Sequence, residues 1–557
     1  MMKSETTMPD SGTVRPRVVA ILAFVFFVVW FCNLGYRSLV RPDEGRYAEI
    51  AREMAVTGDW VTPRLNAIKY FEKPPLQYWA TAAAYNAFGE HEWTARLWSA
   101  VTGFFGVLML GFAGMRLFGR RAGLFSALVV ASSILYAAIG HLNTLDMGVT
   151  FCMTLGLLGF LLSQQSEQRT RESRLWMWLA WAAMGLAFLS KGLIGLVLPG
   201  AAMAAYAFIQ RDISFLKRLE PFAGIAIMLA IALPWVVAVS IANPEFPHFF
   251  FIHEHFQRFL TQVHHRTAPW WFFIPILIAG MLPWTPMLGQ ALIGAWKRDS
   301  TQASFRVRRF LLIYAGVIFL FFSTSQSKLP SYILPIFPAI ALLVGEWLSH
   351  VRGRKLAWLI LPVVAFAVAG AIASPFAAHL GSEKVPAALY TEFSKWLLAG
   401  ALTLLAASCL AMAFARRERI EAAVIALSAG GLLFIQIGMT GHEALSPSFS
   451  TSHLAGIIRP LLGPDTPFYS VRTYEQTLPF YIERTVTLVD YGDELEFGLK
   501  QEPELEIPTI EEFEARWRND RKALAIMGPD VYSELTGRGL PMRLLAADAR
   551  RVIVSKP

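Results

Sequence analysis

The sequence predicts a mainly α-helical protein that crosses a membrane many times and ends in a small soluble α/β domain. Of its 557 residues, 55% are hydrophobic and 16% are charged, and the mean hydropathy is +0.44. A soluble globular chain carries about 25% charged residues. The apolar excess lies in long uncharged runs such as residues 18–36, whose 19 residues can cross a hydrocarbon core of roughly 30 Å as a helix.

The first apolar run is expected to remain in the protein as its first span. It follows a polar start of 17 residues that contains Lys3, Arg15 and Arg17, as a signal peptide would. Its apolar part is too long for a signal peptide, and no Ala-x-Ala cleavage pattern follows it.

The basic residues indicate how many of the apolar runs cross the membrane. Thirteen further apolar runs follow the first, at 76–90, 95–118, 122–139, 146–164, 175–190, 193–209, 221–242, 270–289, 310–323, 331–348, 356–375, 394–415 and 421–438. Short basic clusters separate many of them, which is typical of cytoplasmic loops. With the amino terminus also cytoplasmic, an even number of spans must precede Arg120, so the short and partly polar run 76–90 is assigned to the outer interface. This gives about 13 transmembrane helices and places residues 37–94, 243–269 and everything after about 440 outside.

These boundaries divide the chain into a transmembrane domain, residues 1–440, and an outer α/β domain, residues 441–557. In the outer domain, β-rich runs alternate with helix-like stretches at 510–518 and 531–535. The β-rich runs are 468–471, 478–482, 485–489, 523–527 and 551–554. This domain contains no phosphate loop, metal-ligand spacing or nucleophile motif.

The net charge of +9 does not indicate a nucleic-acid partner, because the basic residues form many short clusters and no single basic face. Cys32, Cys152 and Cys409 all lie within apolar runs, so they predict neither a disulfide framework nor a spaced metal site. The partner that the composition predicts is the lipid bilayer.

The first outer segment begins with a predicted helix and a cluster of charges. Pro42 suits the first turn of a helix, Asp43 and Glu44 suit its positive end, and Gly58 can end it. Its small apolar residues share one side, so we expect an amphipathic helix along the membrane surface. Asp43, Glu44 and Arg46 crowd at the membrane boundary and are candidate site residues.

The remaining charges of this helix have a simpler interpretation, in which Arg52 and Glu53 form a solvated face and Arg46 pairs with Glu49. Tyr70, Glu72 and Lys73 follow, and two prolines then hold the chain extended. A lysine at interface depth suits a lipid phosphate, although it could also be a snorkelling anchor.

Four further charged or polar residues lie at outer ends of spans. Asp146 and Lys191 are costly near the bilayer and therefore candidate functional groups, although Asp146 could cap a helix and Lys191 could mark a turn. Lys328 and Tyr332 lie at the outer mouth of a span whose prolines distort the helix, which is tolerated where a helix lines a cavity.

The second large outer loop, residues 243–269, is rich in aromatic residues and histidine. His253 and His255 share a face of an extended strand, and with Glu72 or Glu254 they could hold a divalent metal, although no standard metal spacing is present. No cofactor is certain from the sequence. Arg258 is a candidate second ligand for a phosphate, because its guanidinium can bind two oxygens.

Three motifs together resemble the 4-amino-4-deoxy-L-arabinose (lipid A) transferases, within the wider group of protein O-mannosyltransferase-like enzymes. They are PDEGRYAEIAREM from Pro42, YFEKPPLQYW from Tyr70 and SKLPSYILPIFPAIALL from Ser327, and the likeness extends from about residue 16 to 440. The resemblance implies the C-type glycosyltransferase (GT-C) fold, an undecaprenyl phosphate-linked aminoarabinose donor and a lipid A phosphate acceptor. It also implies an active site at the periplasmic face of a bacterial inner membrane and resistance to cationic antimicrobial peptides such as polymyxin.

The resemblance also implies roles for individual residues. Asp43 and Asp146 match the family's outer-loop carboxylates, and Lys73 matches the lysine assigned to the carrier phosphate. Arg46 and Arg258 match basic partners of the site, and Lys191 matches the lysine of the third outer turn and is expected to contact substrate. Tyr70, Glu44, Lys328 and Tyr332 are expected to contact substrate. An acceptor phosphate is already an anion and needs no general base, so the two aspartates are expected to hold the sugar's ammonium group in a single inverting displacement.

Two other functions remain open at this point. One is a polyprenyl-phosphate sugar transferase that acts on protein hydroxyls or another envelope glycan. The other is a transporter of lipid substrates, against which the charged groups argue, because they gather outside rather than at a midplane site between repeats.

Overall fold

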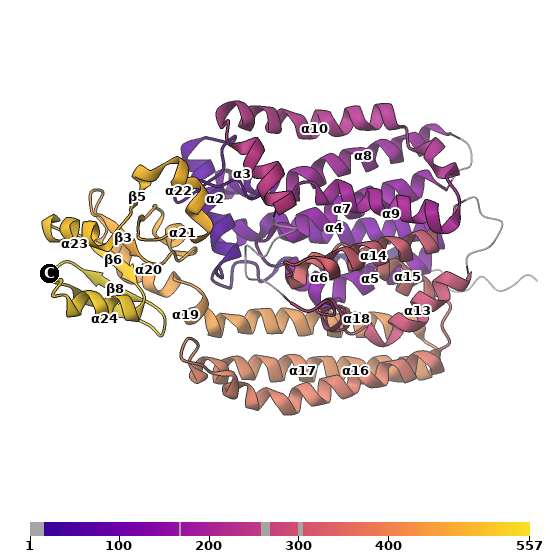
Figure 1. Ribbon diagram of the computed structural model, residues 1–557. Coiled ribbons are helices and arrows are strands. Elements are labelled where there is room, and N and C mark those ends of the chain that lie inside the picture. Colours follow the sequence, from indigo (N-terminus) through magenta and orange to yellow (C-terminus); the bar gives the residue numbers. More distant parts are fainter. Residues whose placement is uncertain (1–15, 166–168, 258–267, 299–304) are drawn as a thin grey trace, which may run out of the picture.

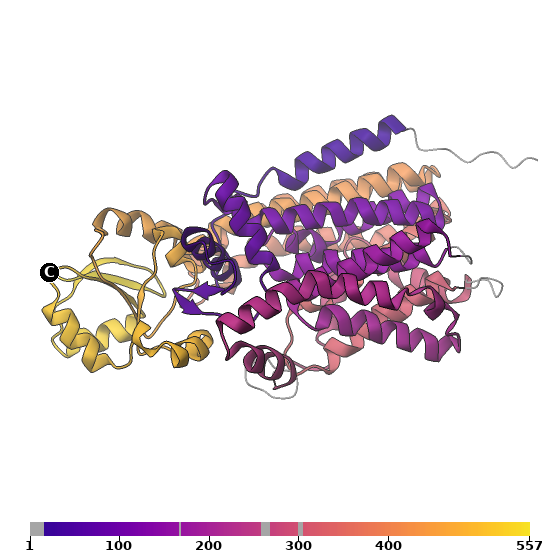
Figure 2. The ribbon, with the colours of Figure 1, turned by 90° about the horizontal axis from the view of Figure 1, so that it is seen from above.

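The computed structural model describes residues 16–165, 169–257, 268–298 and 305–557. Figure 1 shows long helices that run side by side in one bundle and an α/β domain at one end of it. In Figure 2, the first helix, α1 (Pro16–Phe31), lies along the outside of the bundle. The predicted architecture, a polytopic helical protein with a small sheet domain at its C-terminal end, is confirmed.

The described part of the chain contains seven helices that are long and apolar enough to cross a membrane. They are α4 (Glu92–Phe118), α7 (Leu145–Ser163), α10 (Pro221–Ala242), α14 (Val307–Thr324), α16 (Gly353–Ala373), α17 (Ala387–Arg416) and α18 (Ile420–Gly441). The other bundle helices are α5 (Arg120–Ser132), α6 (Ile134–Ile139), α8 (Arg171–Lys191), α9 (Ile194–Gln210), α12 (Phe273–Gly280), α13 (Thr285–Arg298) and α15 (Ile336–Leu348). Each predicted span coincides with helix, whereas the count of thirteen crossings stays a prediction.

Two of the predicted spans, 122–139 and 270–289, are broken helices. The first is divided into α5 and α6 at Ser133, and the second bends by 105° between α12 and α13. The two breaks contact each other, because the Ile134 N–H donates to the Leu282 carbonyl at 3.2 Å and Trp284 Nε1 donates to Ser132 Oγ at 2.9 Å. Polar backbone at membrane depth is tolerated where protein satisfies it in this way.

The first outer loop forms helix α2 (Asp43–Thr57), a hairpin of β1 (Arg64–Leu65) and β2 (Ile68–Lys69), and helix α3 (Leu76–Phe88). Helix α2 begins after Pro42 and ends at Gly58, as predicted, and Gly58 has a left-handed φ of 72°. The prediction that α2 has a solvated charged face was wrong, whereas its position along the membrane surface stays a prediction. Residues 44–54 are all buried, because the C-terminal domain covers the helix.

Buried charges on α2 have specific partners. Arg52 binds both carboxylate oxygens of Glu49 at 2.6 and 2.7 Å, so the predicted pair of Arg46 with Glu49 does not form. Glu53 accepts hydrogen bonds from the backbone N–H groups of Asn66 and Ala67, which holds the β1–β2 turn against α2. Burial, with the nearby charge of Glu49, raises the pKa of Glu53 to about 8.

The C-terminal domain contains a six-stranded sheet in the order β5-β4-β3-β6-β8-β7. Its strands are β3 (Phe468–Val471), β4 (Thr487–Val489), β5 (Glu506–Ile507), β6 (Leu524–Met527), β7 (Arg543–Ala547) and β8 (Val552–Ser555). Strands β3 to β6 pair in parallel, and β7 and β8 are antiparallel. Its helices include α21 (Leu478–Ile482), α22 (Glu496–Gln501), α23 (Ile510–Asn519) and α24 (Pro529–Gly537).

Four of the five predicted β-rich runs contain strands of this sheet. The exception is the run 478–482, which forms helix α21 instead. Pro479 stands in the first turn of that helix, where its missing N–H costs nothing, and the apolar side chains pack between the sheet and α2. Short apolar runs cannot be assigned to strand or helix by periodicity alone.

A buried ion pair joins the outer loop to the bundle. Arg96 on α4 binds both oxygens of Glu44 at 2.7 and 2.9 Å, and neither side chain is exposed by more than 2%. The guanidinium also donates to the carbonyls of Leu34, Arg37 and Ser38. Burial opposes ionisation of Glu44, but the Arg96 charge and hydrogen bonds hold the pKa of this carboxyl at about 2.

Loss of this ion pair should destabilise the protein. Arg96→Met leaves the Glu44 carboxylate buried without its cation, which costs about 3–5 kcal/mol for a buried pair. We expect a thermal denaturation midpoint in detergent that is several degrees lower. Arg116→Met is the matched control, because Arg116 lies on the same helix α4 as Arg96 and forms an exposed ion pair with Glu172 of α8. Equal midpoints for the two variants would contradict this account.

Candidate active site

A cavity of about 690 Å³ lies where the outer loops meet the C-terminal domain. Its walls come from the start of α2, the segment after β2, the facing ends of α7 and α8, the helical segment His248–Gln257, the turn before α15, and the C-terminal domain. The cavity therefore brings together segments that are hundreds of residues apart in the sequence.

Most residues that the sequence singled out line this cavity. These are Asp43, Arg46, Glu72, Lys73, Asp146, Lys191, His253, Glu254 and Tyr332. In the sequence these residues lie in separate segments. The structure brings them to one site.

Three predicted substrate contacts do not line the cavity. Glu44 lies behind its wall in the ion pair with Arg96, and Tyr70 is a buried neighbour of Arg46 with 2% exposure. Lys328 is buried beside the cavity and donates to the Ser325 carbonyl at 2.5 Å. Glu44 and Lys328 thus have structural partners, and the sequence pattern does not distinguish such partners from ligand contact. Arg258 and the side chain of His255 lie outside the described residues.

The first turn of α2 presents one carboxylate and one guanidinium to the cavity. Arg46 Nη1 donates to Asp43 Oδ1 at 2.9 Å, and Arg46 Nη2 forms an ion pair with Glu494 of the C-terminal domain. The side chain of Asp43 is 38% exposed, while that of Arg46 is 10% exposed. Asp43 is thus the accessible carboxylate of this group, and Arg46 is fixed between two acids.

A second charged pair lies between Asp146, in the first turn of α7, and Lys191, at the end of α8. Lys191 Nζ also lies 4.8 Å from the centre of the Tyr332 ring, a cation–π contact. These two candidate functional groups thus stabilise each other across two helix ends. A ligand at this site would meet a lysine and an aspartate whose positions are fixed.

Lys73 lines the cavity. Its Nζ donates to the Glu72 carbonyl at 2.7 Å and to Glu254 Oε2 at 3.1 Å. Pro74 and Pro75 follow, and α3 begins directly after them, so the lysine is held on a short rigid segment. This arrangement favours ligand binding over the snorkelling role.

The described residues do not contain a group of three His, Cys, Asp or Glu side chains that could hold a metal ion. Glu72 and His253 both line the cavity, and His253 Nδ1 lies 3.7 Å from Glu254 Oε1. Because the side chain of His255 is outside the described residues, the predicted metal site stays a prediction.

Part of the cavity wall was not foreseen, because it comes from the C-terminal domain. That domain supplies Gln476, Asp493, Glu494, Glu496, Phe497 and Lys500. No motif marks these residues, and only the acidic run after Tyr491 is a signal that could have drawn attention to them. With them, seven carboxylates line the cavity against four lysine and arginine side chains, so the site as a whole favours a cationic ligand group.

Known families match two separate parts of the chain. Residues 454–556 match the aminoarabinose transferase C-terminal domain, and residues 17–250 match the dolichyl-phosphate-mannose-protein mannosyltransferase family. The undecaprenyl phosphate-alpha-4-amino-4-deoxy-L-arabinose arabinosyl transferase of Erwinia tasmaniensis is 31% identical over 488 residues, which cover 86% of this chain and 87% of the relative. The chain belongs to the aminoarabinose transferase family. The resemblance seen in the three motifs is thereby confirmed, and the protein is a glycosyltransferase.

Solved structures agree with the aminoarabinose transferase assignment. The crystal structure of ArnT from Cupriavidus metallidurans bound to undecaprenyl phosphate superposes with a TM-score of 0.92 at 38% identity, covering 97% of this chain and 98% of that one. The oligosaccharyltransferase of Archaeoglobus fulgidus superposes with a TM-score of 0.52 at 14% identity, covering 92% of this chain and 69% of that one, which shows a shared fold alone. The predicted GT-C fold is confirmed.

One glycine of this aminoarabinose transferase site allows α2 to approach the C-terminal domain. Gly45 stands between Glu44 and Arg46, and a Cβ atom there would lie 2.6 Å from backbone atoms of both Gln476 and Thr477. No real Cβ tolerates such a distance to backbone, so any other residue would push the two segments apart.

We therefore predict that Gly45→Ala lowers the thermal denaturation midpoint and the transferase activity together, because it separates α2 from the C-terminal wall of the cavity. Gly456→Ala is the matched control, since a Cβ at this helical position meets no atom within 4 Å. The control should be neutral or slightly stabilising, as alanine is about 1 kcal/mol better than glycine within a helix. A Gly45→Ala protein as stable and active as the control would refute the close contact.

Proposed function

We propose that the protein transfers 4-amino-4-deoxy-L-arabinose from undecaprenyl phosphate to a phosphate group of lipid A, at the periplasmic face of a bacterial inner membrane. The observation that carries this proposal is the cavity itself. It combines Lys73 and Arg46, which suit a phosphate, with the carboxylates Asp43 and Asp146, which suit an ammonium group. The names of the relatives and of the ligand bound to the Cupriavidus protein support the same donor.

The position of the cavity supports a periplasmic site. The predicted inner loops carry the basic clusters, and Arg169, Lys217 and Arg218 of two such loops line one common pocket. These loops lie before α8 and between α9 and α10, at the end of the bundle away from the C-terminal domain (Figure 1). Short basic loops face the cytoplasm. Residues of the C-terminal domain line the cavity, and that domain lies at the opposite end of the bundle (Figure 1), where a lipid-linked donor in the outer leaflet could reach the site.

The transfer needs no general base when the acceptor is a phosphate. An anionic phosphate oxygen of lipid A attacks the anomeric carbon of the sugar, and the bond from that carbon to the undecaprenyl phosphate oxygen breaks. The bonding electrons leave with the carrier phosphate, and the anomeric carbon is inverted. Lys73 and Arg46 would stabilise the charge that develops on the departing phosphate, where preorganised cations act most strongly.

The carboxylates of the cavity serve donor recognition in this proposal. Their excess over the lysine and arginine side chains suits a sugar that carries an ammonium group. Asp43 is the accessible carboxylate on α2, and Asp146 faces the cavity from α7. A divalent metal bound by Glu72, His253 and His255 would add a Lewis acid near the phosphate. Such a metal is tested by activity after chelation and re-addition of zinc, magnesium or manganese.

The first test is transfer by the purified protein reconstituted with the undecaprenyl phosphate-linked aminoarabinose and lipid A. We predict that Lys73→Ala abolishes transfer while the protein stays inserted and folded, because the carrier phosphate loses its nearest cation. Lys69→Ala is the matched control, since Lys69 pairs with Glu245 and does not line the cavity. Near wild-type transfer by Lys73→Ala would contradict the assignment of Lys73 to the phosphate site.

The second test compares two donors that differ only in the sugar amine. We predict that Asp43→Asn loses far more activity with the amino sugar than with a neutral 4-hydroxy pentose on the same carrier, and that Asp146→Asn behaves alike. The reason is that each aspartate pairs with the ammonium group rather than activating the acceptor. Equal losses with both donors would instead favour a general base, as expected for a hydroxyl acceptor.

A further inference from the structure

A chain of polar contacts leads from the C-terminal domain to the candidate donor site. Gln476 Nε2 donates to Glu494 Oε1 at 2.8 Å, and the other oxygen of Glu494 forms the ion pair with Arg46. Arg46 in turn binds Asp43 at 2.9 Å. The side chain of Gln476 is buried, with 8% exposure, and it lines the cavity. The orientation of Arg46 therefore depends on a carboxylate that Gln476 holds.

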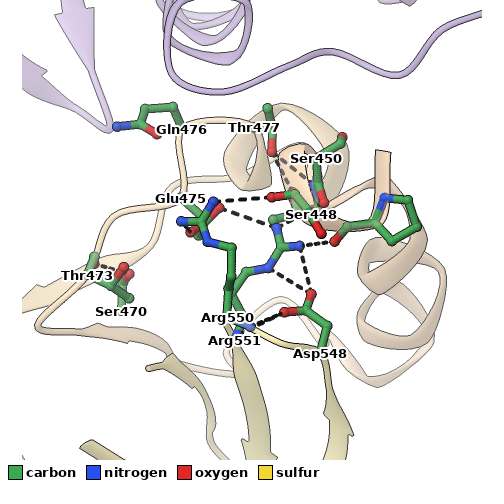
Figure 3. A network of polar contacts seen from close by, with 12 residues as sticks. Ser448, Ser450, Ser470, Thr473, Glu475, Gln476, Thr477, Asp548, Arg550 and Arg551 are labelled. Atoms are coloured by element: carbon green, nitrogen blue, oxygen red, sulfur yellow. Dashed lines mark hydrogen bonds and ion pairs between the residues drawn. The ribbon is translucent and has the colours of Figure 1, made fainter. Parts of the chain in front are cut away.

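The residue before Gln476 is fixed by a second network, which Figure 3 shows from close by. Arg551 is 1% exposed and binds Glu475 at 3.3 Å and Asp548 at 2.7 Å, and Arg550 binds Glu475 at 3.4 Å. Arg551 also donates to the carbonyls of Pro447 and Ser450 at 2.5 and 2.9 Å. This network ties strand β8 and the segment after α18 to Glu475.

The residue after Gln476 is fixed as well. Thr477 Oγ1 accepts a hydrogen bond from the Thr451 N–H at 3.1 Å, and the two hydroxyl groups lie 2.9 Å apart. On the opposite side, Gly45 of α2 packs directly against the Gln476–Thr477 backbone. Gln476 is thus held from both neighbours and from the helix that carries Arg46, which limits where its side chain can point.

We propose that Gln476 is a positioning residue, which holds Glu494 so that Arg46 and Asp43 are oriented for transfer, and that the Arg551–Glu475 network holds Gln476 in place. This inference rests on the proposed function of the cavity. In this proposal the C-terminal domain orients residues of the donor site, and Gln476 acts only through Glu494.

The protonation state of Glu494 links this arrangement to pH. Burial raises the pKa of Glu494, whereas Arg46 and the Gln476 amide lower it. The other titratable groups near Glu494 are Glu72 after β2, Asp493 beside it, and the tyrosines Tyr70, Tyr474 and Tyr491. Removal of the Gln476 amide should therefore raise the pKa of Glu494 further. Glu494 would then lose its charge, and Arg46 its partner, at a higher pH than in the wild type.

The test measures kcat, KM and the pH profile of transfer for Gln476→Leu and for the nearly isosteric Gln476→Glu. Each variant loses the hydrogen bond from the Gln476 amide to the charged Glu494 carboxylate. We therefore expect kcat to fall by about tenfold or more with little change in KM. The acid limb of the profile should move to higher pH. In a protein that already carries Glu494→Gln, neither Gln476 substitution should reduce kcat below that of the single Glu494→Gln variant, because all of these substitutions act through the same carboxylate.

Gln501→Leu and Gln501→Glu are the matched controls, since Gln501 is exposed in the same domain and does not line the cavity. If Gln476→Leu fails to fold, the measurements on Gln476→Glu alone test the positioning role. A folded Gln476 variant with unchanged kcat and an unchanged pH profile would overturn the proposal. So would a double variant in which the kcat losses of the Gln476 and Glu494→Gln substitutions add fully and the pH profile does not move. A wild-type protein without transfer activity would overturn the proposed function instead, so the two failures are distinguishable.

Discussion

The outer half of the molecule depends on the buried ion pair between Glu44 and Arg96. A buried carboxylate is tolerated only when it is paired and hydrogen-bonded, and Glu44 binds Arg96, the Val40 N–H and the Asn143 N–H. One carboxylate thus joins α4, the start of α2 and the segment before α7. Asp43 precedes Glu44 and Asp146 follows Asn143 by three residues, so the same ion pair sets the positions of both candidate catalytic carboxylates.

The C-terminal domain supplies part of the cavity wall as well as covering α2. Its Glu494 holds Arg46, and the centre of its Phe497 ring lies 3.8 Å from that of Phe249, which fastens the helical segment His248–Gln257 to the C-terminal domain at the cavity wall. Gly45 permits the approach of α2 that these contacts require. Removal of the domain would therefore expose the buried charges of α2 and remove several of the cavity's carboxylates, so stability and substrate recognition depend on the same interface.

The sequence predicted the parts of the site that local chemistry marks. Lys73, Asp146 and Lys191 are charges beside apolar runs, which the cost of charge near a bilayer singles out without any structure. It could not predict that Arg52 and Glu53 are buried, because a domain 400 residues later covers them. Nor could it show that Glu44 pairs with Arg96, 52 residues away, instead of contacting substrate. Gln476 and Glu494 carry no motif, and only the folded chain brings them to the cavity.

The central claim is that transfer occurs in the cavity shared by the outer loops and the C-terminal domain. A cryo-electron microscopy structure of the protein in lipid nanodiscs with the undecaprenyl phosphate-linked amino sugar tests it most directly. The account predicts the carrier phosphate against Lys73 and the sugar between Asp43 and Asp146, with the C-terminal domain in the position seen here. A sugar bound elsewhere, or a C-terminal domain displaced so that Glu494 no longer contacts Arg46, would contradict it.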